Sequence, residues 1–366
     1  EPKIPVSVTA TATASGAPNI NFYLLLDSSP SMGIAATTDG INTMIANTQG
    51  QCDSPPAGGP TCGCAFACHE TNPSDEKYYL PTGTMNTAVT PHQLCSATPS
   101  GPTPAWPPWQ PIASKTAYYY CEMSGTGNPA TAQYPTGEDN FALSQSLGVT
   151  LRIDNLREGV QSLMTTAQSA ETTNNAQYQM GIYTFDNSVT KIQTLTSSLT
   201  LAAASAANIQ QLQVYSNNWL TSSNNNGDTD TDYTDAMTYI NNQMPDPGNG
   251  TNAKNDTPQE VLFFVTDGVE DESVGGSRVQ SLMNTSYCTT IKNRGIRIAV
   301  LYTEYLPIPA NGWYNSHISP FQSQISANMQ SCASPGLFFE VTQGGDISAA
   351  LQALFNAAIQ TAHLTL

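Results

Sequence analysis

The first marked feature of the hydrophobic pattern is a short, uninterrupted apolar run at residues 22–26, which ends in Asp27, Ser29 and Ser31. A run of this length between polar residues is typical of a strand buried on both faces, as in the middle of a parallel sheet covered by helices. In open α/β sheets ligands bind at the carboxyl ends of the strands, so oxygen atoms at alternating positions there can converge on one small cation. A solvated turn is the alternative for this stretch taken alone.

From residue 151 onward the chain alternates between strand and helix patterns. Apolar residues between Leu151 and Ala167 follow helical spacing and give one apolar face that would pack on a sheet. We expect further strands at 180–185, 189–195, 261–265, 296–302 and 337–341, and further helices at 198–215, 279–291, 321–332 and 347–362. Strands alternating with helices over about 200 residues predict an α/β fold with a doubly wound, mostly parallel sheet flanked by helices.

Residues 34–146 interrupt this alternation, because they are rich in Pro, Gly, Thr and Asn and show no sustained helical period. A segment this long stays ordered only when it is cross-linked, so we expect a disulfide-held insertion after the first core strand. Its cysteines, whose pairing stays open, are Cys52, Cys62, Cys64, Cys68, Cys95 and Cys121. The chain then divides into residues 1–33, with an N-terminal strand at 5–13 and the first core strand, the insertion 34–146, and residues 147–366 with the remainder of the domain.

Composition narrows the class of partner and the compartment. Among 366 residues, 28 are Asp or Glu and 11 are Lys or Arg, which gives a formal net charge of −17. Nucleic acids and anionic membranes are bound by basic surfaces, so this balance disfavours both. The low charged fraction of 11% and the even number of eight cysteines favour an oxidising, extracytoplasmic location: periplasm, cell surface or secreted. No run of the sequence approaches the roughly 18 to 20 apolar residues that span a bilayer.

Two further segments carry oxygen side chains at related positions. The run at 261–265 ends in Thr266 and Asp267, and Thr231 stands just before a predicted helix with Met237, Ile240 and Met244 on one face. An Asp-x-Ser-x-Ser after one strand, a Thr before a helix and an Asp after a later strand together resemble the metal-ion-dependent adhesion site of von Willebrand factor type A domains. The resemblance implies a Rossmann-like type A fold. The metal ligands that it implies are Asp27, Ser29, Ser31, Thr231 and Asp267.

The resemblance also implies the kind of ion and the kind of partner. Ser29, Ser31 and Thr231 would offer neutral hydroxyl oxygens, and Asp27 and Asp267 would offer carboxylates that often act through bound water in this family. A site of oxygens with few direct anionic ligands suits Mg²⁺, with Mn²⁺ or Ca²⁺ as alternatives. Such an ion accepts one more anionic oxygen from outside, which in the family usually comes from an Asp or Glu of a protein partner.

One residue near these motifs departs from the family pattern, and a second residue is another candidate ligand. Pro30 stands where many type A domains have Gly, which fixes one backbone angle of the metal loop without removing a ligand. Thr229 could serve in place of Thr231, although Thr231 matches the family's Thr-x-x-x-x-Ala-hydrophobic spacing. We expect Thr231 to be the ligand.

An independent calcium site is a further alternative in the same region. Asp228, Asp230 and Asp232 form an Asp-x-Asp-x-Asp run like the opening of an EF-hand loop. Tyr233 and Tyr239 then stand where that loop needs Gly and Glu, so a solvated acidic loop is the expectation. The acidic residues 270–272 would add negative charge beside the proposed metal.

The segment 62–69, CGCAFACH, has alternatives of its own. Haem attachment of the c type uses Cys-x-x-Cys-His, and the spacing before His69 is one residue longer. Zinc fingers need a second cysteine pair at finger spacing, which does not follow. We expect disulfides here, with haem and zinc as the alternatives. Cys288 and Cys332 lie on successive predicted helices, and we expect them to pair.

Enzyme motifs are not recognisable in the sequence. The four histidines stand in no triad setting, and there is no phosphate-binding loop or zinc-protease motif. We therefore expect a protein that is not an enzyme.

Several pieces are similar to one branch of the type A superfamily, the TadG-like (TadE/G-like) proteins of the Tad (tight-adherence, Flp) pilus system. They are the segment from Asp27 to Met32, GCAFACH at 63–69, LRID at 151–154, VTDG at 265–268 and CAS at 332–334. The family implies a role in assembly, anchoring or surface adhesion of bacterial pili, with pilus components or a surface ligand as partner. Its members usually carry an N-terminal membrane helix, which this sequence does not show, so membrane contact is expected only through such a segment. A structural pilus or surface component, with a vestigial metal site and contacts made by the Cys-rich insertion, is the alternative.

Overall fold

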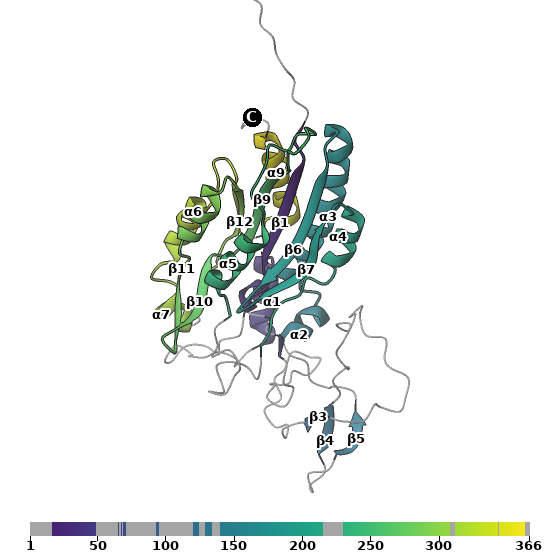
Figure 1. The fold of residues 1–366 in the computed structure, drawn as a ribbon. Helices are drawn as coiled ribbons and strands as arrows, with labels where there is room; N and C mark the ends of the chain where they lie inside the picture. Colours follow the sequence, from purple (N-terminus) through teal and green to yellow (C-terminus); the bar gives the residue numbers. More distant parts are fainter. Residues whose placement is uncertain are drawn as a thin grey trace, which may run out of the picture.

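The computed structural model describes residues 17–48, 65, 67, 69–70, 93–94, 120–123, 129–133, 140–214, 230–307, 312–342 and 344–362. Its centre is a six-stranded sheet in the order β13-β12-β9-β1-β6-β7, in which every neighbouring pair is parallel except β6 with β7 (Figure 1). The strands are β1 (Ile20–Asp27), β6 (Tyr178–Phe185), β7 (Val189–Thr196), β9 (Gln259–Thr266), β12 (Arg297–Thr303) and β13 (Phe338–Val341). The predicted α/β fold with a mostly parallel sheet is confirmed.

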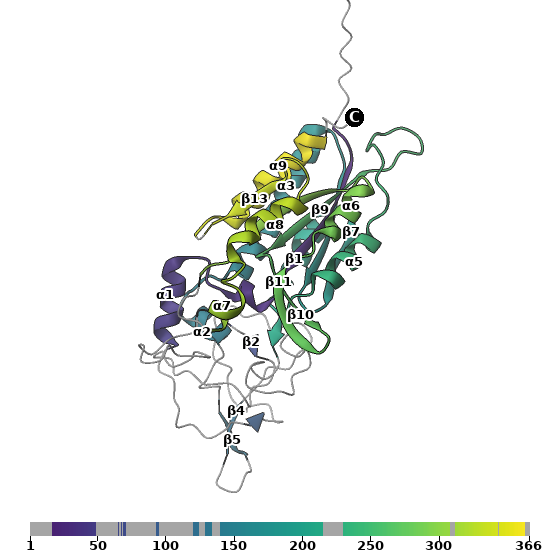
Figure 2. The ribbon, with the colours of Figure 1, turned by 90° about the vertical axis from the view of Figure 1, so that its left-hand side faces the viewer.

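Helices cover both faces of this sheet, as Figures 1 and 2 show from two directions. The hydrophobic core on one face includes residues of α1 (Thr38–Asn47), α2 (Asn140–Ser146), α3 (Arg152–Asn174), α4 (Leu199–Ala206) and α9 (Ile347–Ala362). The core on the other face includes residues of α5 (Tyr233–Gln243), α6 (Ser286–Asn293), α7 (Gly312–His317) and α8 (Ile325–Cys332). Two layers of helix on a parallel sheet explain why the central strands are continuous apolar runs.

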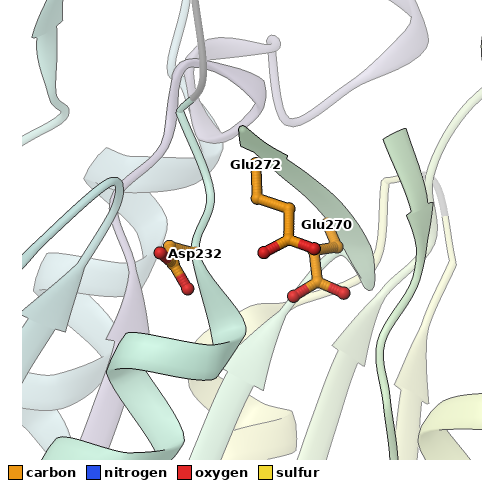
Figure 3. Close-up of side chains that lie close together, drawn as sticks. All are labelled: Asp232, Glu270 and Glu272. Atoms are coloured by element: carbon orange, nitrogen blue, oxygen red, sulfur yellow. The ribbon is translucent and has the colours of Figure 1, made fainter. Parts of the chain in front are cut away.

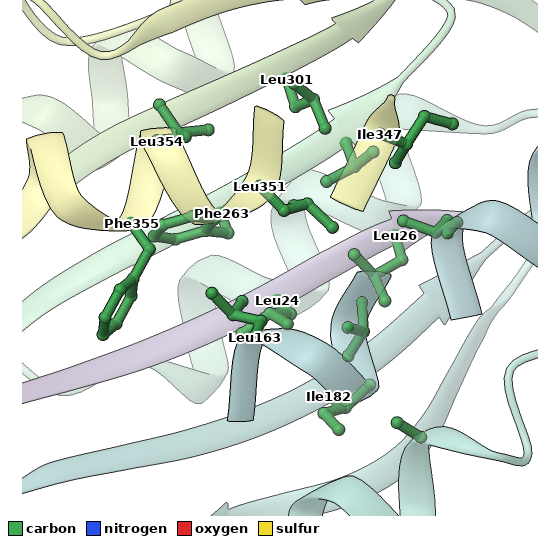
Figure 4. Packing of buried hydrophobic residues seen from close by; sticks show 14 of the residues in the cluster. Leu24, Leu26, Leu163, Ile182, Phe263, Leu301, Ile347, Leu351, Leu354 and Phe355 are labelled. Atoms are coloured by element: carbon green, nitrogen blue, oxygen red, sulfur yellow. The ribbon is translucent and has the colours of Figure 1, made fainter. Parts of the chain in front are cut away.

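Strand β1 is buried along its whole length and divides its side chains between the two cores. Leu24 and Leu26 point to the face of α3 and α9 (Figure 4). Tyr23 and Leu25 belong to the core on the opposite face. Phe22 lies with its ring centroid 5.0 to 5.7 Å from those of Tyr178, Phe263 and Phe355. Full burial of an apolar side chain such as Phe22 stabilises the fold by roughly 1.5–3 kcal/mol. Because β1 contributes such side chains to both faces of the sheet, it is the centre of both cores.

Shorter elements surround the sheet. They are η1 (Pro30–Gly33), η3 (Gln322–Gln324), the pair β2 (His69–Glu70) and β8 (Gln213–Val214), the three strands β3 (Gln93–Leu94), β4 (Tyr120–Met123) and β5 (Pro129–Gln133), and the hairpin of β10 (Val269–Val274) and β11 (Ser277–Leu282). No helix among the described residues is both long and apolar enough to span a membrane.

Some sequence-based expectations fall outside the described residues. They are the N-terminal strand at 5–13, Thr229, Asp228 and the cysteines Cys52, Cys62, Cys64, Cys68 and Cys95, and with them the haem and zinc alternatives. Cys121 lies in β4, where only the backbone is described.

The helix expected at 279–291 is wrong in its first half. Residues Ser277–Leu282 form β11, which pairs antiparallel with β10 around Gly275 and Gly276, and α6 begins only at Ser286. Both glycines have positive φ, +61° and +84°, which a tight two-residue hairpin turn requires. Val279, Leu282 and Met283 happen to match helical spacing, and the Gly-Gly turn before them overrides that pattern.

Helices α1 and α4 also differ from what the sequence predicts for these parts of the chain. Helix α1 lies in the stretch expected to lack a helical period, and only Met44 of this helix is fully buried. Thr37 caps it by accepting a hydrogen bond from the Gly40 N–H at 3.1 Å. Helix α4 ends at Ala206 rather than near residue 215, because the backbone N–H groups of Ala207, Asn208 and Ile209 turn back to the carbonyls of residues 204–206.

A disulfide between Cys288 of α6 and Cys332 of α8 closes a loop of 44 residues. Both residues are fully buried on the α5/α6 face of the sheet. We expect the double variant Cys288→Ser/Cys332→Ser to lose roughly 3–4 kcal/mol of unfolding free energy, because the unfolded chain regains the entropy of that loop. Urea unfolding of oxidised and reduced wild type beside the double variant measures it. Equal stability of all three samples would contradict the expectation.

A buried carboxyl lies at the end of the sheet opposite the strand carboxyl ends. Glu260 of β9 is 1% exposed and accepts a hydrogen bond from the Asn21 side-chain amide of β1 at 2.8 Å. Burial raises the pKa of Glu260 to about 8, against the lowering effects of Asn21 and the Arg294 charge. The folded state therefore holds a proton here that the unfolded state releases at a lower pH.

This carboxyl makes stability fall with rising pH. Because the unfolded pKa lies near 4.5 and the folded one near 8, stability is lost progressively between those pH values. We expect Glu260→Gln to reduce that slope and to be more stable than wild type at pH 8.5 by roughly 1–3 kcal/mol. Urea midpoints from pH 5 to 8.5 measure it, with Glu158→Gln at an exposed position as the control. An unchanged slope in Glu260→Gln would contradict the assignment.

Candidate metal site

The strand order places a topological switch point between β1 and β9. From β1 the chain proceeds outward through β6 and β7 on one side, then returns to β9 and proceeds outward through β12 and β13 on the other. Ligands of doubly wound sheets bind where the strand order reverses, outside the carboxyl ends of the strands. Asp27 ends β1 and Asp267 follows β9, so both carboxylates lie at this point, and both are 0% exposed.

The loop after β1 folds back on Asp27 through hydrogen bonds. The Ser29 backbone N–H and hydroxyl donate to Asp27 Oδ1 at 2.9 and 2.6 Å, and the Ser29 and Ser31 hydroxyl oxygens lie 2.9 Å apart. Pro30 begins the 3₁₀ helix η1, where a fixed φ suits the turn and no N–H is needed. The residue that departs from the family pattern therefore fits the loop without displacing either serine.

The second oxygen of Asp27 is held from β9. The Thr266 hydroxyl donates to Asp27 Oδ2 at 2.7 Å, and its oxygen lies 2.5 Å from the Tyr233 hydroxyl of α5. Since Thr266 has one hydroxyl hydrogen and gives it to Asp27, Tyr233 must donate to Thr266. The Asp267 backbone N–H also donates to Asp27. Strands β1 and β9 and helix α5 are thus joined at one carboxylate.

Asp267 is less fully bonded than Asp27. Its Oδ1 accepts from the Val269 N–H at 3.4 Å, and the nearby Ser31 hydroxyl favours the charged form of its carboxylate. Within the described residues, Asp267 Oδ2 is buried with no hydrogen-bond partner. Burial is the main cause that raises the pKa of both Asp27 and Asp267, and for Asp267 the negative charge of Asp27 adds to it. Two carboxylates buried side by side favour a proton or a cation between them.

The hydroxyl hydrogens in this cluster are too few for its contacts. Ser29 gives its one hydrogen to Asp27, and the one hydrogen of Ser31 faces two acceptors, the Ser29 oxygen at 2.9 Å and the Asp267 carboxylate. Whichever of them Ser31 bonds, one acceptor is left without a hydrogen, and a cation can bind that acceptor. The surplus of acceptors, together with the unpartnered Asp267 Oδ2, fits a hard divalent cation.

Thr231 is positioned by its backbone rather than by a side-chain hydrogen bond to the two carboxylates. It is 4% exposed, and its backbone forms an antiparallel bridge with Asp271, with N–H to O distances of 3.0 and 2.9 Å. This bridge ties the entry of α5 to β10, and Tyr233, two residues later, is the donor to Thr266. The structure thus brings Asp27, Ser29, Ser31 and Asp267 into one hydrogen-bonded cluster, while Thr231 is held through its backbone to Asp271 of β10.

A second acidic cluster lies at the start of α5. Figure 3 shows Asp232 facing Glu270 and Glu272 of β10, and one carboxylate oxygen of each lies within 4.8 Å of the others. Asp232 also caps α5 by accepting from the Asp235 N–H at 2.8 Å. Burial raises the pKa of Glu270 to about 7, with further effect from Glu272 and Asp232. Asp232, the last residue of the Asp-x-Asp-x-Asp run, thus lies in a cluster with two residues of β10.

The structure adds residues that sequence reasoning did not assign to the site. Thr266 and Tyr233 orient Asp27, and the Ser28 hydroxyl donates to the buried Asp186 at 3.2 Å. Arg152, the first residue of α3, is buried close enough to Asp267 for its charge to act on that carboxylate. The sequence marks Thr266 and Arg152 only by their place in VTDG and LRID, two of the segments that are similar to the TadG-like family.

Comparison with known proteins gives distant structural likenesses. No family model and no curated protein sequence matches this chain. The von Willebrand factor domain of the type V pili tip protein Mfa5 from Porphyromonas gingivalis is similar over 96% of this chain and 97% of its own, with 7% identity and a TM-score of 0.42. The pilus adhesin SpaC from Lactobacillus rhamnosus GG is similar over 58% of this chain, with 13% identity and a TM-score of 0.36.

A third similar structure is proximal thread matrix protein 1 from the mussel byssus, solved with a zinc-occupied MIDAS motif, with 9% identity over 56% of this chain and a TM-score of 0.35. The matched part of this chain spans 28% of the SpaC chain and 43% of the mussel chain. At these identities and TM-scores we base the function on the residues of this chain.

The hydroxyl of Thr266 should contribute more to the free energy of unfolding than an equally buried hydroxyl at the end of the neighbouring strand β12. Thr303 of β12 is 2% exposed, and its hydroxyl has no partner among the described residues. We expect Thr266→Val to lose about 1–3 kcal/mol of unfolding free energy, because Asp27 and Tyr233 each lose a partner, and Thr303→Val to be neutral or stabilising. Urea unfolding of the two variants measures the difference, and equal effects would contradict the bonding described for Asp27.

Proposed function

We propose that this chain is a protein-binding domain of the von Willebrand type A class that binds its partner through a divalent cation, and that it is not an enzyme. The observation that carries the proposal is the excess of oxygen acceptors at the switch point: the hydroxyls of Ser29 and Ser31 have two hydrogens for three contacts, and among the described residues Asp267 Oδ2 is buried without a partner. The cluster offers no general base beside a nucleophile with an open approach, because both carboxylates are buried.

The donor atoms favour a hard ion. They are carboxylate and hydroxyl oxygens, with no His or Cys among the described residues that line the cluster, so Mg²⁺ suits the site best and Mn²⁺ or Ca²⁺ are the alternatives. Ser29, Ser31, Asp27 and Asp267 would hold the ion, with Thr231 as the fifth candidate ligand. Bound there, the cation would neutralise the carboxylates and present an open coordination position to solvent.

The exposure of the cluster points to a partner that approaches from one side. Asp27, Ser29 and Asp267 are buried, while Ser31 and Pro30 are partly exposed. A ligand from outside therefore meets the ion beside η1, and an acidic side chain is the natural donor because the ion would remain under-neutralised. With a formal net charge of −17, the chain would repel an acidic partner elsewhere on its surface, so the cation would provide both affinity and position.

The biological setting that we propose is pilus-associated adhesion or assembly outside the cytoplasm. Support comes from the similarity of the Asp27 to Met32 segment, GCAFACH, LRID, VTDG and CAS to TadG-like proteins. The Cys288–Cys332 disulfide supports an oxidising compartment. Pilus components or a surface ligand would be the partner.

Calorimetric titration of chelator-stripped protein with Mg²⁺, Mn²⁺ and Ca²⁺ tests the metal site. We expect saturable binding by wild type, none by Asp27→Ala/Asp267→Ala, and wild-type binding by the exposed control Asp235→Ala. Circular dichroism of the double variant checks that it is folded. Glu272→Gln should also bind like wild type, because it belongs to the second acidic cluster.

Two outcomes would contradict the proposal in different ways. Binding that Glu272→Gln loses and the double variant retains would move the cation to the cluster of Asp232, Glu270 and Glu272. No binding by wild type would leave the alternative of a vestigial site, in which partner binding survives Asp27→Ala and is lost on deletion within residues 52–121.

A further inference from the structure

A buried arginine lies at the same sheet edge as the two carboxylates. Arg152 begins α3, is 5% exposed, and donates from Nη2 to the Glu304 backbone carbonyl at 2.6 Å. Within the described residues, its Nη1 is buried without a hydrogen-bond partner. An arginine keeps its charge even when it is buried. A full positive charge therefore lies here, and its removal from water costs free energy.

The packing of the α3 start explains why Arg152 points inward. Leu151 and Ile153 on either side are fully buried in the core of the α3 face, and the Arg152 backbone N–H donates to the Ile34 carbonyl at 3.0 Å. Asp154 accepts from the Leu151 N–H at 3.1 Å and pairs with Arg157 at 2.9 Å. The carboxylate of Asp154 is therefore already bonded to Leu151 and Arg157 at the start of α3. The side chain of Arg152 faces the carboxyl ends of the strands instead.

The charge that Arg152 meets there is that of Asp267. Burial lowers the pKa of Arg152, and the attraction of Asp267 is the first of the effects that oppose this and favour the charged guanidinium; Arg152 in turn favours the charged Asp267 carboxylate. Among the described residues the two side chains form no direct ion pair, and Asp267 Oδ2 and Arg152 Nη1 are an unpartnered acceptor and an unpartnered donor of opposite charge. Asp267 thus gains a counter-charge while one of its oxygens stays open.

We propose that Arg152 is a built-in counter-charge for the Asp27–Asp267 pair, which weakens cation binding and makes the loaded site more attractive to an anionic partner. The inference rests on the proposed metal site and names its regulation. Without the ion, Arg152 offsets one of the two buried negative charges. With the ion bound, the same charge repels the cation and shifts the loaded site by one unit toward positive, which favours a carboxylate from outside.

Two substitutions at this position separate charge from contact. Arg152→Lys keeps the positive charge and a donor for the Glu304 carbonyl, and Arg152→Gln keeps a donor and removes the charge. If Arg152 only connects α3 to the segment after β12, both variants should behave alike. If the charge is what matters, only Arg152→Gln should change the cation affinity strongly.

Mg²⁺ titration of the full chain, stripped with chelator, measures that effect. We expect Arg152→Gln to bind Mg²⁺ at least about tenfold more tightly than wild type, and Arg152→Lys to stay within about threefold of it. In chelator, Arg152→Gln should melt at a lower temperature than wild type and gain more on addition of saturating Mg²⁺. Equal or weaker Mg²⁺ binding by Arg152→Gln, or parallel changes in both variants, would overturn the proposal.

A double-mutant cycle in chelator tests the counter-charge without any metal. Asp267→Asn removes the charge that Arg152 balances, so Arg152→Gln should cost less thermal stability in the Asp267→Asn background than in wild type. The same cycle applies if Arg152→Gln folds poorly, because the double variant should then recover. Additive losses would overturn the counter-charge. A wild type that binds no cation, with coupling intact in the cycle, would instead refute the proposed metal function and leave the Arg152–Asp267 interaction standing.

Discussion

The carboxylate of Asp27 is the group on which the arrangement of this edge depends. It is fully buried and ionisable, so it is tolerated only if its oxygens are bonded from all sides. Ser29 bonds one oxygen from the loop that follows, and Thr266 bonds the other from β9. Because Thr266 in turn accepts from Tyr233, one carboxylate fixes the turn into η1, the register of two strand ends and the first turn of α5. A substitution at any of these positions therefore affects the others, because hydrogen bonds of defined direction connect them.

Backbone constraints extend this order to the elements that follow β9. Gly268 has φ +82°, and a Cβ there would lie 2.4 Å from Ile325 Cγ2, so the chain can leave Asp267 in this direction only through glycine. The turn leads into β10, whose Asp271 pairs through its backbone with Thr231 before α5. The hairpin β10–β11 is therefore held against the same edge that carries the carboxylates, although its sequence is polar and its tip is exposed at Val274.

Much of the fold is predictable from the chain because its central strands are buried on both faces. The apolar runs at 22–26 and 261–265 and the helical spacing after Leu151 have few other structures open to them, and β1, β9 and α3 are found there. The hairpin after Asp267 is missed because Val279 and Leu282 mimic a helical period, while Gly275 and Gly276 decide the structure. Helix α1 is missed because a single fully buried residue, Met44, leaves little pattern to detect. At the site, motif order predicts the oxygens of Asp27, Ser29, Ser31 and Asp267, but the role proposed for Arg152 depends on the charge of Asp267, more than a hundred residues away in the sequence, which no local spacing records.

The buried acids of this protein are stabilised in different ways, and the contrast locates the site. Asp271 has a guanidinium partner, with Arg278 Nε at 2.8 Å, and an amide from Gln280 at 2.8 Å, so its charge is compensated by direct contact. Glu260 stands alone beside the Asn21 amide and can be neutralised by a single proton, as its raised pKa indicates. Asp27 and Asp267 lie together, with hydroxyls and backbone N–H groups as their direct donors and a guanidinium that acts on Asp267 without an ion pair. Neither a salt bridge nor one proton satisfies two adjacent carboxylates and two hydroxyl groups that have two hydrogens for three contacts. Of the ways to stabilise such a group at the switch point of a parallel sheet, a bound divalent cation is the one that uses every oxygen present.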